Sequence, residues 1–481
     1  MVMGSLREET QVVVIGSGPG GYVAALRLAD LGKEVVLVEK RERPGGVCLL
    51  EGCIPSKALI HAVEVKRSAI EAREFGLGVS GLEVDLDKLR GWTAGIVSGL
   101  SQGVAGLLKR RGVQIIQGHA RFSSPTSLEI EGGEISGIDF EQAVIATGSC
   151  LNKLPDGIVS SVWSSAEALT LPRVPQSLLV VGGGYIGLEM GLVYQGLGAE
   201  VSVVEFFPRL LMGADKDLVE VMVEQVGGRL HEILTDSKVL AITEIDGDPA
   251  NGFNVEIEAP EEKIERRFDQ VLVAIGRRPN TDDIGIENTR VVLDPKGHIV
   301  TDQECRTAEP NLYAIGDAAT GPMLAHKATR EGKVAAEVIA ADGDDSLAAF
   351  DNRAIPAVVF TDPEIAWTGL TEAEAGEQGI AVNIGRFPLS ALGRARTLGR
   401  TDGMVKILAD PQTGSILGVG MVGPLASELI AEATLAVEMG ATLEDLISTI
   451  HPHPTLSEAL LEAAEVAAGE AVHVNPPRKV R

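Results

Sequence analysis

The sequence predicts an α/β fold with two Rossmann-like dinucleotide-binding domains and a C-terminal α+β domain. Three observations support this prediction: a repeated strand–glycine turn–helix pattern, a cysteine pair just after its first copy, and a change of pattern near residue 350. The chain has 481 residues, which exceeds a single hydrophobic core, so several domains are expected.

The repeated unit opens with a short apolar strand and continues into a helix and a second strand. The first copy carries Gly16, Gly18 and Gly21, and the second carries Gly182, Gly184, Tyr185, Ile186 and Gly187. In both copies the second strand ends in an acid, Glu39 or Glu205, 23 residues after the first glycine. One G-x-G-x-x-G is a weak signal, but two copies in matched surroundings indicate two dinucleotide-binding units.

The glycines of this motif have separate roles. The first permits a tight turn, the second lets a pyrophosphate approach the helix N-terminus, and the third allows the helix to pack closely on the strand. The terminal acids can accept hydrogen bonds from ribose hydroxyls, and an acid repels a 2′-phosphate, so Glu205 favours NAD over NADP. The alternative is that each acid merely ends its strand in solvent.

Three further apolar strands end in glycine and are expected to border the cofactor sites. They supply Thr147, Gly148 and Ser149 in the first, Gly276 in the second and Asp317 in the third. Beyond Phe350 the pattern changes to strands at 354–359, 403–408 and 415–422 and helices at 426–440 and 455–469. Strands followed by helices without a nucleotide motif predict an α+β domain.

Cys48 and Cys53 form a Cys-x4-Cys pair downstream of the first glycine motif, which suggests a dithiol that exchanges electrons with a bound cofactor. A straight helix would hold the two Cα atoms roughly 8.7 Å apart, beyond the reach of a disulfide. A bonded pair therefore needs a break, which Gly52 allows, and Pro55 suits the first turn of a helix over 55–67. A helix N-terminus and Lys57 favour a thiolate. The alternatives are a metal site and two unrelated buried thiols.

A second reactive segment carries His451, His453 and Glu458. Histidine is the natural base for a dithiol near neutral pH, and the flanking prolines present His453 from a loop. Glu458 can orient the imidazole, but Thr455-x-x-Glu458 is also a capping box, so both roles stay open. His451 is more consistent with a structural role.

Composition limits the other possibilities. A net charge of −26 disfavours nucleic acid and anionic membrane as partners. Four cysteines do not make a disulfide framework, and Cys150 and Cys305 are expected to be ordinary core residues. No secretory signal and no run of about 18 apolar residues is apparent, so a cytoplasmic enzyme is expected.

These residues together resemble the flavoprotein disulfide reductases and, within them, the dihydrolipoamide dehydrogenases, over nearly the whole chain. The matching segments are both glycine motifs, Cys48 and Gly52-Cys53-Ile-Pro-Ser-Lys57, Gly316-Asp317, Met323-Leu-Ala-His326 and His451-x-His453-Pro-Thr-x-x-Glu458. Glutathione reductases usually carry basic residues around the position of Glu205. Mercuric reductases carry an extra cysteine pair near the C-terminus, whereas no cysteine follows Cys305 here.

The resemblance implies oxidation of protein-bound dihydrolipoamide with reduction of NAD+, using FAD. It implies an FAD-binding domain at 1–152 that returns at 282–350, an NAD-binding domain at 153–281 and a C-terminal dimerisation domain at 351–481. It also implies a homodimer in which His453 serves the partner subunit's site. The lipoyl group would arrive on a carrier protein of a 2-oxo acid dehydrogenase or glycine cleavage complex.

The resemblance also assigns site residues. Cys48 would be the interchange thiol, Cys53 the thiol that contacts flavin, and His453 the base oriented by Glu458, while Lys57 and Glu189 would pair beside the flavin ring. The FAD contacts would be Gly16, Gly18, Gly21, Glu39, Lys40, Gly46, Val47, Lys57, Ala120, Thr147, Gly148, Ser149, Asp317, Met323, Leu324, Ala325 and His326. The NAD contacts would be Gly182, Gly184, Tyr185, Ile186, Gly187, Glu189, Glu205, Val239 and Gly276. No metal is implied.

The chain departs from the family between the two cysteines. Leu50 and Glu51 stand where the family usually has asparagine and an apolar residue, so a polar group is lost and a negative charge that opposes thiolate formation is gained. This leaves two alternatives to be tested: a reductase of another low-molecular-weight disulfide such as glutathione disulfide, and a non-catalytic flavoprotein that serves as an assembly component.

Overall fold

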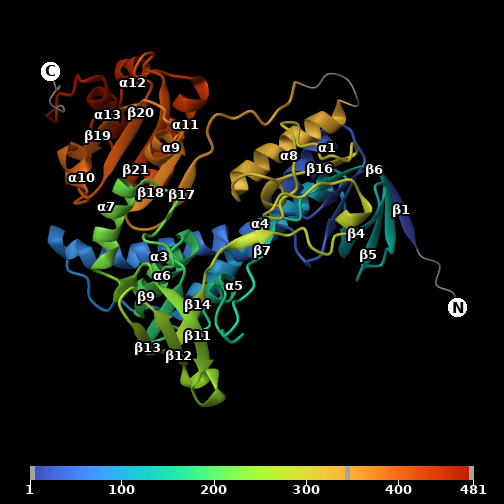
Figure 1. The fold of residues 1–481 in the computed structure, drawn as a ribbon, viewed down its shortest axis with the longest axis horizontal. Coiled ribbons are helices and arrows are strands. Elements are labelled where there is room, and N and C mark those ends of the chain that lie inside the picture. Colours follow the sequence, from blue (N-terminus) through green and yellow to red (C-terminus); the bar gives the residue numbers. More distant parts are fainter. Residues whose placement is uncertain (1–5, 342–346, 476–481) are drawn as a thin grey trace. The chain divides into compact units, whose positions relative to one another are not determined.

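The computed structural model describes residues 6–341 and 347–475. The chain divides into two units, drawn as a ribbon in Figure 1. The first unit consists of Met1–Leu59, Glu83–Lys153 and Gly276–Asp351, and the second of Ile60–Leu82, Leu154–Ile275 and Asn352–Arg481. The chain therefore leaves the first unit and returns to it.

The first unit is built on one seven-stranded sheet in the order β3-β2-β1-β6-β5-β4, with β16 also paired to β6. Strands β3, β2, β1, β6 and β16 are parallel, whereas β4 and β5 join antiparallel. The strands are β1 (Arg7–Ile15), β2 (Val35–Glu39), β3 (Gln114–Gln117), β4 (His119–Ser124), β5 (Ser127–Glu131), β6 (Gly137–Ile145) and β16 (Leu312–Ala314). A separate ribbon pairs β7 (Ser149–Leu151) with β15 (Arg277–Pro279).

Strand β1 shows how this sheet divides two cores. Val12 and Val14 face one cluster, with residues of α1 (Pro19–Asp30), α4 (Leu86–Arg110) and α8 (Ala325–Ala340). Val13 and Ile15 face the other, with residues of β4, β5 and β6. Because side chains alternate along a strand, a run of consecutive apolar residues is what a sheet buried on both faces requires. The remaining elements in or entering this unit are α2 (Gly46–Glu51), α3 (Cys53–Glu71), η4 (Ile286–Asn288) and η5 (Gly316–Ala318).

The second unit holds the second glycine motif. A parallel sheet runs in the order β10-β9-β8-β14, and a three-stranded antiparallel sheet β11-β12-β13 accompanies it. The elements are α5 (Ser165–Leu169), β8 (Ser177–Val181), α6 (Tyr185–Leu197), β9 (Glu200–Val204), α7 (Lys216–Gly227), β10 (Glu232–Leu234), β11 (Lys238–Glu244), η2 (Ile245–Gly247), η3 (Pro249–Asn251), β12 (Phe253–Glu258), β13 (Lys263–Phe268) and β14 (Gln270–Val273). The segment η1 (Ala72–Phe75) follows α3.

The C-terminal part of the second unit is a five-stranded antiparallel sheet in the order β17-β18-β21-β20-β19, with helices packed against it. Its elements are β17 (Ala357–Val359), β18 (Glu364–Gly369), α9 (Glu372–Gln378), β19 (Asn383–Pro388), η6 (Leu389–Ala391), α10 (Gly393–Thr397), β20 (Met404–Ala409), β21 (Ile416–Gly423), α11 (Ala426–Met439), α12 (Leu443–Ser448) and α13 (Glu458–Ala468). The α+β prediction is confirmed. The last helix begins three residues later than expected, because Thr455 to Ser457 form its lead-in.

One helical stretch, Gly46–Phe75, is long and apolar enough to cross a membrane by length and composition, with a mean hydropathy of 1.3. No stretch of this kind was expected from the sequence. Its backbone breaks at Gly52, where φ is −143° and ψ −112°, so α2 and α3 are separate helices. Length and hydropathy alone are weak evidence for a membrane span.

Candidate functional site

The first glycine turn has the geometry that a dinucleotide needs. Gly16 has φ +101°, and a Cβ there would lie 2.4 Å from Ala146 O, while a Cβ on Gly21 would lie 1.9 Å from Gly16 O. A Cβ on Gly18, by contrast, would meet nothing within 4 Å. The first and third positions are therefore closed to any side chain, and the second opens at the N-terminus of α1, where no side chain caps the helix. Backbone N–H groups there are available to a pyrophosphate.

The second turn repeats this arrangement around α6. A Cβ on Gly182 would lie 2.4 Å from Ala274 O and one on Gly187 would lie 2.0 Å from Gly182 O, whereas one on Gly184 would meet nothing. Helix α6 also begins without a side-chain cap. Both predicted turns thus form cradles of the same shape.

The two terminal acids are buried, which argues against strand ends that merely reach solvent. Glu39 is 6% exposed and Glu205 is 8% exposed. Each carboxylate accepts a hydrogen bond from the residue after the first glycine: Ser17 N–H donates to Glu39 over 2.9 Å, and Gly183 N–H donates to Glu205 over 2.6 Å. The other oxygen of each carboxylate accepts from the backbone N–H two residues after the acid, which is Arg41 N–H for Glu39 and Phe207 N–H for Glu205.

The cysteine pair lies on the helix break that the disulfide geometry required. Cys48 belongs to α2 and Cys53 begins α3, with Gly52 between them, and no disulfide joins the two sulfurs in this structure. A hydrogen bond with Cys53, followed by burial, raises the pKa of Cys48, while the charge of Lys57 acts in the opposite direction. The two thiols are therefore inequivalent: Cys53 is exposed and Cys48 is partly buried.

The charge of Glu51 has a partner. Arg41 donates to the Glu51 carboxylate over 2.9 Å, and Leu50 packs against the hydrophobic core of the first unit. The acid that the sequence suggested would oppose thiolate formation is thus partly neutralised by a cation of the same unit.

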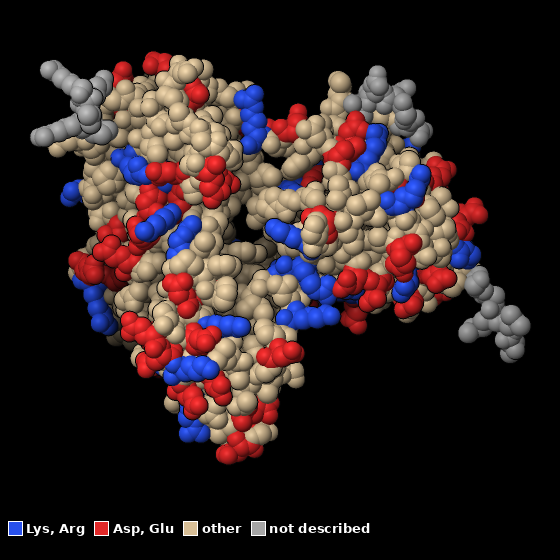
Figure 2. Space-filling view, viewed as in Figure 1, with Lys and Arg blue, Asp and Glu red and all other residues tan. Residues whose placement is uncertain are grey.

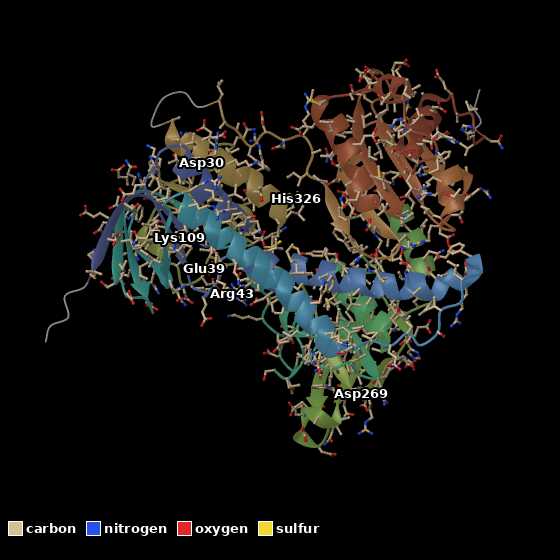
Figure 3. The ribbon with its side chains drawn as sticks, turned by 180° about the vertical axis from the view of Figure 1, so that it is seen from behind. Asp30, Glu39, Arg43, Lys109, Asp269 and His326 are labelled. Atoms are coloured by element: carbon tan, nitrogen blue, oxygen red, sulfur yellow. The ribbon has the colours of Figure 1, made fainter. Side chains whose placement is uncertain are left out.

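The residues expected near the flavin lie around the carboxyl ends of β2, β6 and β16. Ser149 donates to Asp317 over 2.6 Å, and Thr147 Oγ1 is buried with no hydrogen-bond partner in the described part of the chain. Figure 3 shows Glu39 and His326, from β2 and α8, as sticks. The other expected FAD residues also lie in this unit: Ala120 is buried, Gly46, Val47, Gly148, Met323, Leu324 and Ala325 are half-buried, and Lys40 is exposed.

The residues expected near NAD lie in the second unit, except Gly276, which begins the returning segment of the first unit. Tyr185 is 43% exposed, and Ile186 and Val239 are half-buried. Glu189 is buried and accepts a hydrogen bond from Phe360 N–H over 3.1 Å, a contact with the C-terminal sheet that the sequence did not suggest.

The proposed base has a carboxylate partner. His453 Nδ1 lies 2.8 Å from one oxygen of Glu458, and the other oxygen accepts from Thr455 N–H over 2.7 Å. Glu458 thus contacts both His453 and the Thr455 N–H, but the reciprocal half of a capping box is not formed, since no side chain caps α13; its catalytic role stays a prediction. Burial alone would raise the pKa of Glu458, but these two hydrogen bonds hold it below its usual value. His451 is buried, 4% exposed, against Glu432 at 2.8 Å, which suits a structural role.

Among the described residues, one cluster of three carboxylates is compact enough to hold a metal ion, and it consists of Asp215, Asp217 and Glu372. Its centre is taken by Lys406, which is 0% exposed and lies 2.6 Å from Asp215 and 2.7 Å from Asp217. Arg386 adds a second cation at 2.9 Å from Asp217. This cluster is an internal ion-pair network rather than a metal site.

Sequence reasoning missed several residues that hold the candidate site. Ser17 donates its hydroxyl to Glu39 and accepts from Gly45 N–H. Arg277 donates to Ser149 through both its Nε and its terminal nitrogen, over 2.8 and 2.7 Å. Ser17 occupies a variable position of the glycine motif, so only its hydroxyl could have signalled this role. Arg277 directly follows Gly276, and a basic residue after a strand-ending glycine was the available signal.

The two cradles, the buried acids and the unpartnered Thr147 hydroxyl fit FAD in the first unit and NAD in the second. A family model described as pyridine nucleotide-disulphide oxidoreductase matches residues 10–332, and a model of that family's dimerisation domain matches residues 355–464.

Known proteins of similar sequence include a dihydrolipoyl dehydrogenase of Haloferax volcanii, 46% identical over 98% of this chain and 99% of the relative. Another, from Geobacillus stearothermophilus, is 44% identical with the same two coverages. Similar solved structures include LpdA from Mycobacterium tuberculosis (TM-score 0.84, 27% identity, 95% of this chain and 99% of that chain). A second is the HOCl-induced flavoprotein disulfide reductase RclA from Escherichia coli (TM-score 0.80, 26% identity, 94% and 98%). This chain therefore belongs to the pyridine nucleotide-disulphide oxidoreductase family.

Proposed function

We propose that this protein oxidises protein-bound dihydrolipoamide to lipoamide and reduces NAD+. The observation that carries the proposal is the dithiol at the break between α2 and α3, directly after a dinucleotide cradle. The protein uses FAD and NAD, as its family does. The relatives that match nearly all of the chain at 42–46% identity are dihydrolipoyl dehydrogenases, which favours this substrate over other disulfides.

The order of the sulfur steps follows the family resemblance, which makes Cys48 the interchange thiol. In the oxidised enzyme Cys48 and Cys53 are joined, and a substrate thiolate attacks Cys48 Sγ, forms a mixed disulfide and displaces Cys53 as a thiolate. The second substrate thiolate then attacks its own mixed-disulfide sulfur, which releases lipoamide and leaves Cys48 reduced. When bound, FAD and NAD+ supply the redox chemistry that carries the two electrons onward as hydride.

The base in this scheme is His453. Each substrate thiol must lose a proton to attack, and a neutral imidazole held through Nδ1 by Glu458 can accept it at Nε2. The side chain of His453 is 79% exposed, which leaves it available to a group outside its own unit. We infer that it serves the dithiol of a second copy of this chain in a homodimer, for which the dimerisation-domain match gives the general support.

The substitution Cys53→Ser tests whether the dithiol carries the proposed enzymatic activity. This variant should lose NAD+ reduction by dihydrolipoamide while retaining bound flavin. During anaerobic titration with dihydrolipoamide the wild type should develop a long-wavelength charge-transfer band, and the variant should not. Undiminished turnover in the variant would refute the proposed mechanism, whereas a wild type that turns over neither lipoamide nor glutathione disulfide would favour a non-catalytic role.

The rival substrate is glutathione disulfide or a similar small disulfide, and the unusual Leu50-Glu51 pair is the observation in its favour. Turnover measured with NADH and either lipoamide or glutathione disulfide separates the two. We further propose a cytoplasmic protein that receives its lipoyl group from a 2-oxo acid dehydrogenase or glycine cleavage complex. Residues of both signs are scattered over the face in Figure 2. Along the chain, however, 68 Asp and Glu exceed 42 Lys and Arg, a balance that suits neither nucleic acid nor an anionic membrane.

A further inference from the structure

A buried ion pair on α8 holds both backbone polar groups of Gly316. Glu331 Oε2 accepts from Gly316 N–H over 2.7 Å, and Lys327 Nζ donates to Gly316 O over 3.3 Å. Lys327 Nζ lies 2.8 Å from Glu331 Oε1, and the two side chains are 2% and 5% exposed. All of these contacts lie within the first unit.

The placement of this pair is not explained by folding alone. Moving two charges out of water is costly, and well-packed apolar residues of similar volume often serve stability as well or better. Each group also makes one hydrogen bond to the same residue, Gly316, which has φ +71° and precedes Asp317. The pair therefore fixes a backbone conformation that ordinary side chains rarely adopt.

The side chain of Asp317 is held by a separate contact. Ser149 donates to it over 2.6 Å, and Ser149 is itself held by Arg277. Helix α8 is also locked to the pyrophosphate cradle, because a Cβ on Gly332 would lie 2.6 Å from Gly20 O. One helix thus supports the glycine turn at one point and the Gly316–Asp317 loop at another.

We infer that Lys327 and Glu331 are positioning residues for FAD. They set the Gly316–Asp317 backbone so that the Asp317 carboxylate is presented to the flavin nucleotide, and they touch no reacting atom themselves. The inference rests on the proposed FAD site and adds to it two residues that act through the loop.

The test compares Glu331→Gln and the double variant Lys327→Met/Glu331→Leu with a matched control, Glu337→Gln. Glu337 is also on α8 and pairs with Arg27 of α1 at 2.8 Å, but it does not contact Gly316. FAD retention is measured on the purified holoenzymes by dilution and the fluorescence of released FAD, and thermal unfolding is recorded in parallel. We expect the FAD dissociation constant to rise about tenfold in Glu331→Gln and further in the double variant, with the control within twofold of wild type.

A purely structural role would lower the melting temperature without a matching change in FAD affinity, so the two readouts separate the possibilities. Dissociation constants of both variants within twofold of the Glu337→Gln control would overturn the inference. If the double variant fails to fold, the nearly isosteric Glu331→Gln decides the question alone. Failure of the proposed function would look different, since the wild type would then retain FAD but would not reduce NAD+ with dihydrolipoamide.

Discussion

Replacing Glu458 with glutamine should disable the base without removing it. The carboxylate accepts two hydrogen bonds, from His453 Nδ1–H at 2.8 Å and from Thr455 N–H at 2.7 Å. A glutamine has a single acceptor oxygen and one NH2 donor. If the oxygen keeps Thr455, the NH2 faces Nδ1 and favours the tautomer with its proton on Nε2, which cannot accept a proton from the substrate.

The size of the effect follows from these contacts. A hydrogen bond to a charged group contributes about 1.5–3 kcal/mol, which corresponds to roughly 10- to 150-fold in rate. General-base catalysis contributes about 10²–10⁴-fold. We therefore expect the kcat for NAD+ reduction by dihydrolipoamide to fall at least ~10²-fold.

The assay has a control variant on the same helix. Glu462 of α13 also holds an imidazole, with His473 Nδ1 at 2.6 Å, and Glu462→Gln should leave kcat within about threefold of wild type because no base role is assigned to His473. Oxidation of NADH by ferricyanide needs no thiol base and should be unchanged in both variants. A Glu458→Gln enzyme that retains more than a third of wild-type kcat would refute the tautomer argument.

Three further predictions concern stability and the dithiol. Lys406→Met should destabilise the fold by about 3–5 kcal/mol, since it leaves the buried Asp215 carboxylate without its cation. Arg386→Met, at a 42% exposed side chain, should cost no more than about 1 kcal/mol. Urea unfolding measures both, and equal losses would contradict the network. Burial alone would raise the pKa of Asp217, but Lys406 and Arg386 hold it below its usual value. The stabilisation of the folded state by the Asp217 carboxylate is therefore present above about pH 5 and lost as pH falls below about 4. Acid unfolding followed by circular dichroism should show a smaller loss of stability in Lys406→Met than in the wild type. Leu50→Asn should shift the reduction potential of the dithiol or the turnover rate. Glu51→Gln should change both quantities less, because Glu51 already has a cationic partner. Identical potentials and rates in Leu50→Asn and the wild type would exclude a role for Leu50.

Much of the fold could be predicted because its signals are local. A glycine motif is short, and the 23-residue spacing between Gly16 and Glu39 recurs between Gly182 and Glu205, so each unit was visible in one stretch of sequence. The break at Gly52 was predictable for the same reason, since disulfide geometry excludes a straight helix between positions five apart.

The contacts that support the site were not predictable because their partners lie far apart in the chain. Arg277 reaches Ser149 across 128 positions, and Phe360 N–H reaches Glu189 across 171. Glu331 lies only 15 positions from Gly316, but its bond depends on how α8 turns relative to the loop. Spacing gives no information about such contacts until the strands and helices are packed.

The two cradles share one device, and their difference at the position after the first glycine connects the first cradle to the dithiol. In both, the strand-ending acid binds the N–H after the first glycine, so its position is fixed before any ribose arrives. The second copy has Gly183 at that position, and a side chain there would meet Leu210 at 2.3 Å. The first copy has Ser17, whose hydroxyl donates to Glu39 and accepts from Gly45 N–H, immediately before α2. Ser17 therefore ties the nucleotide acid to the segment that carries Cys48, a connection that only the unit with a redox dithiol needs.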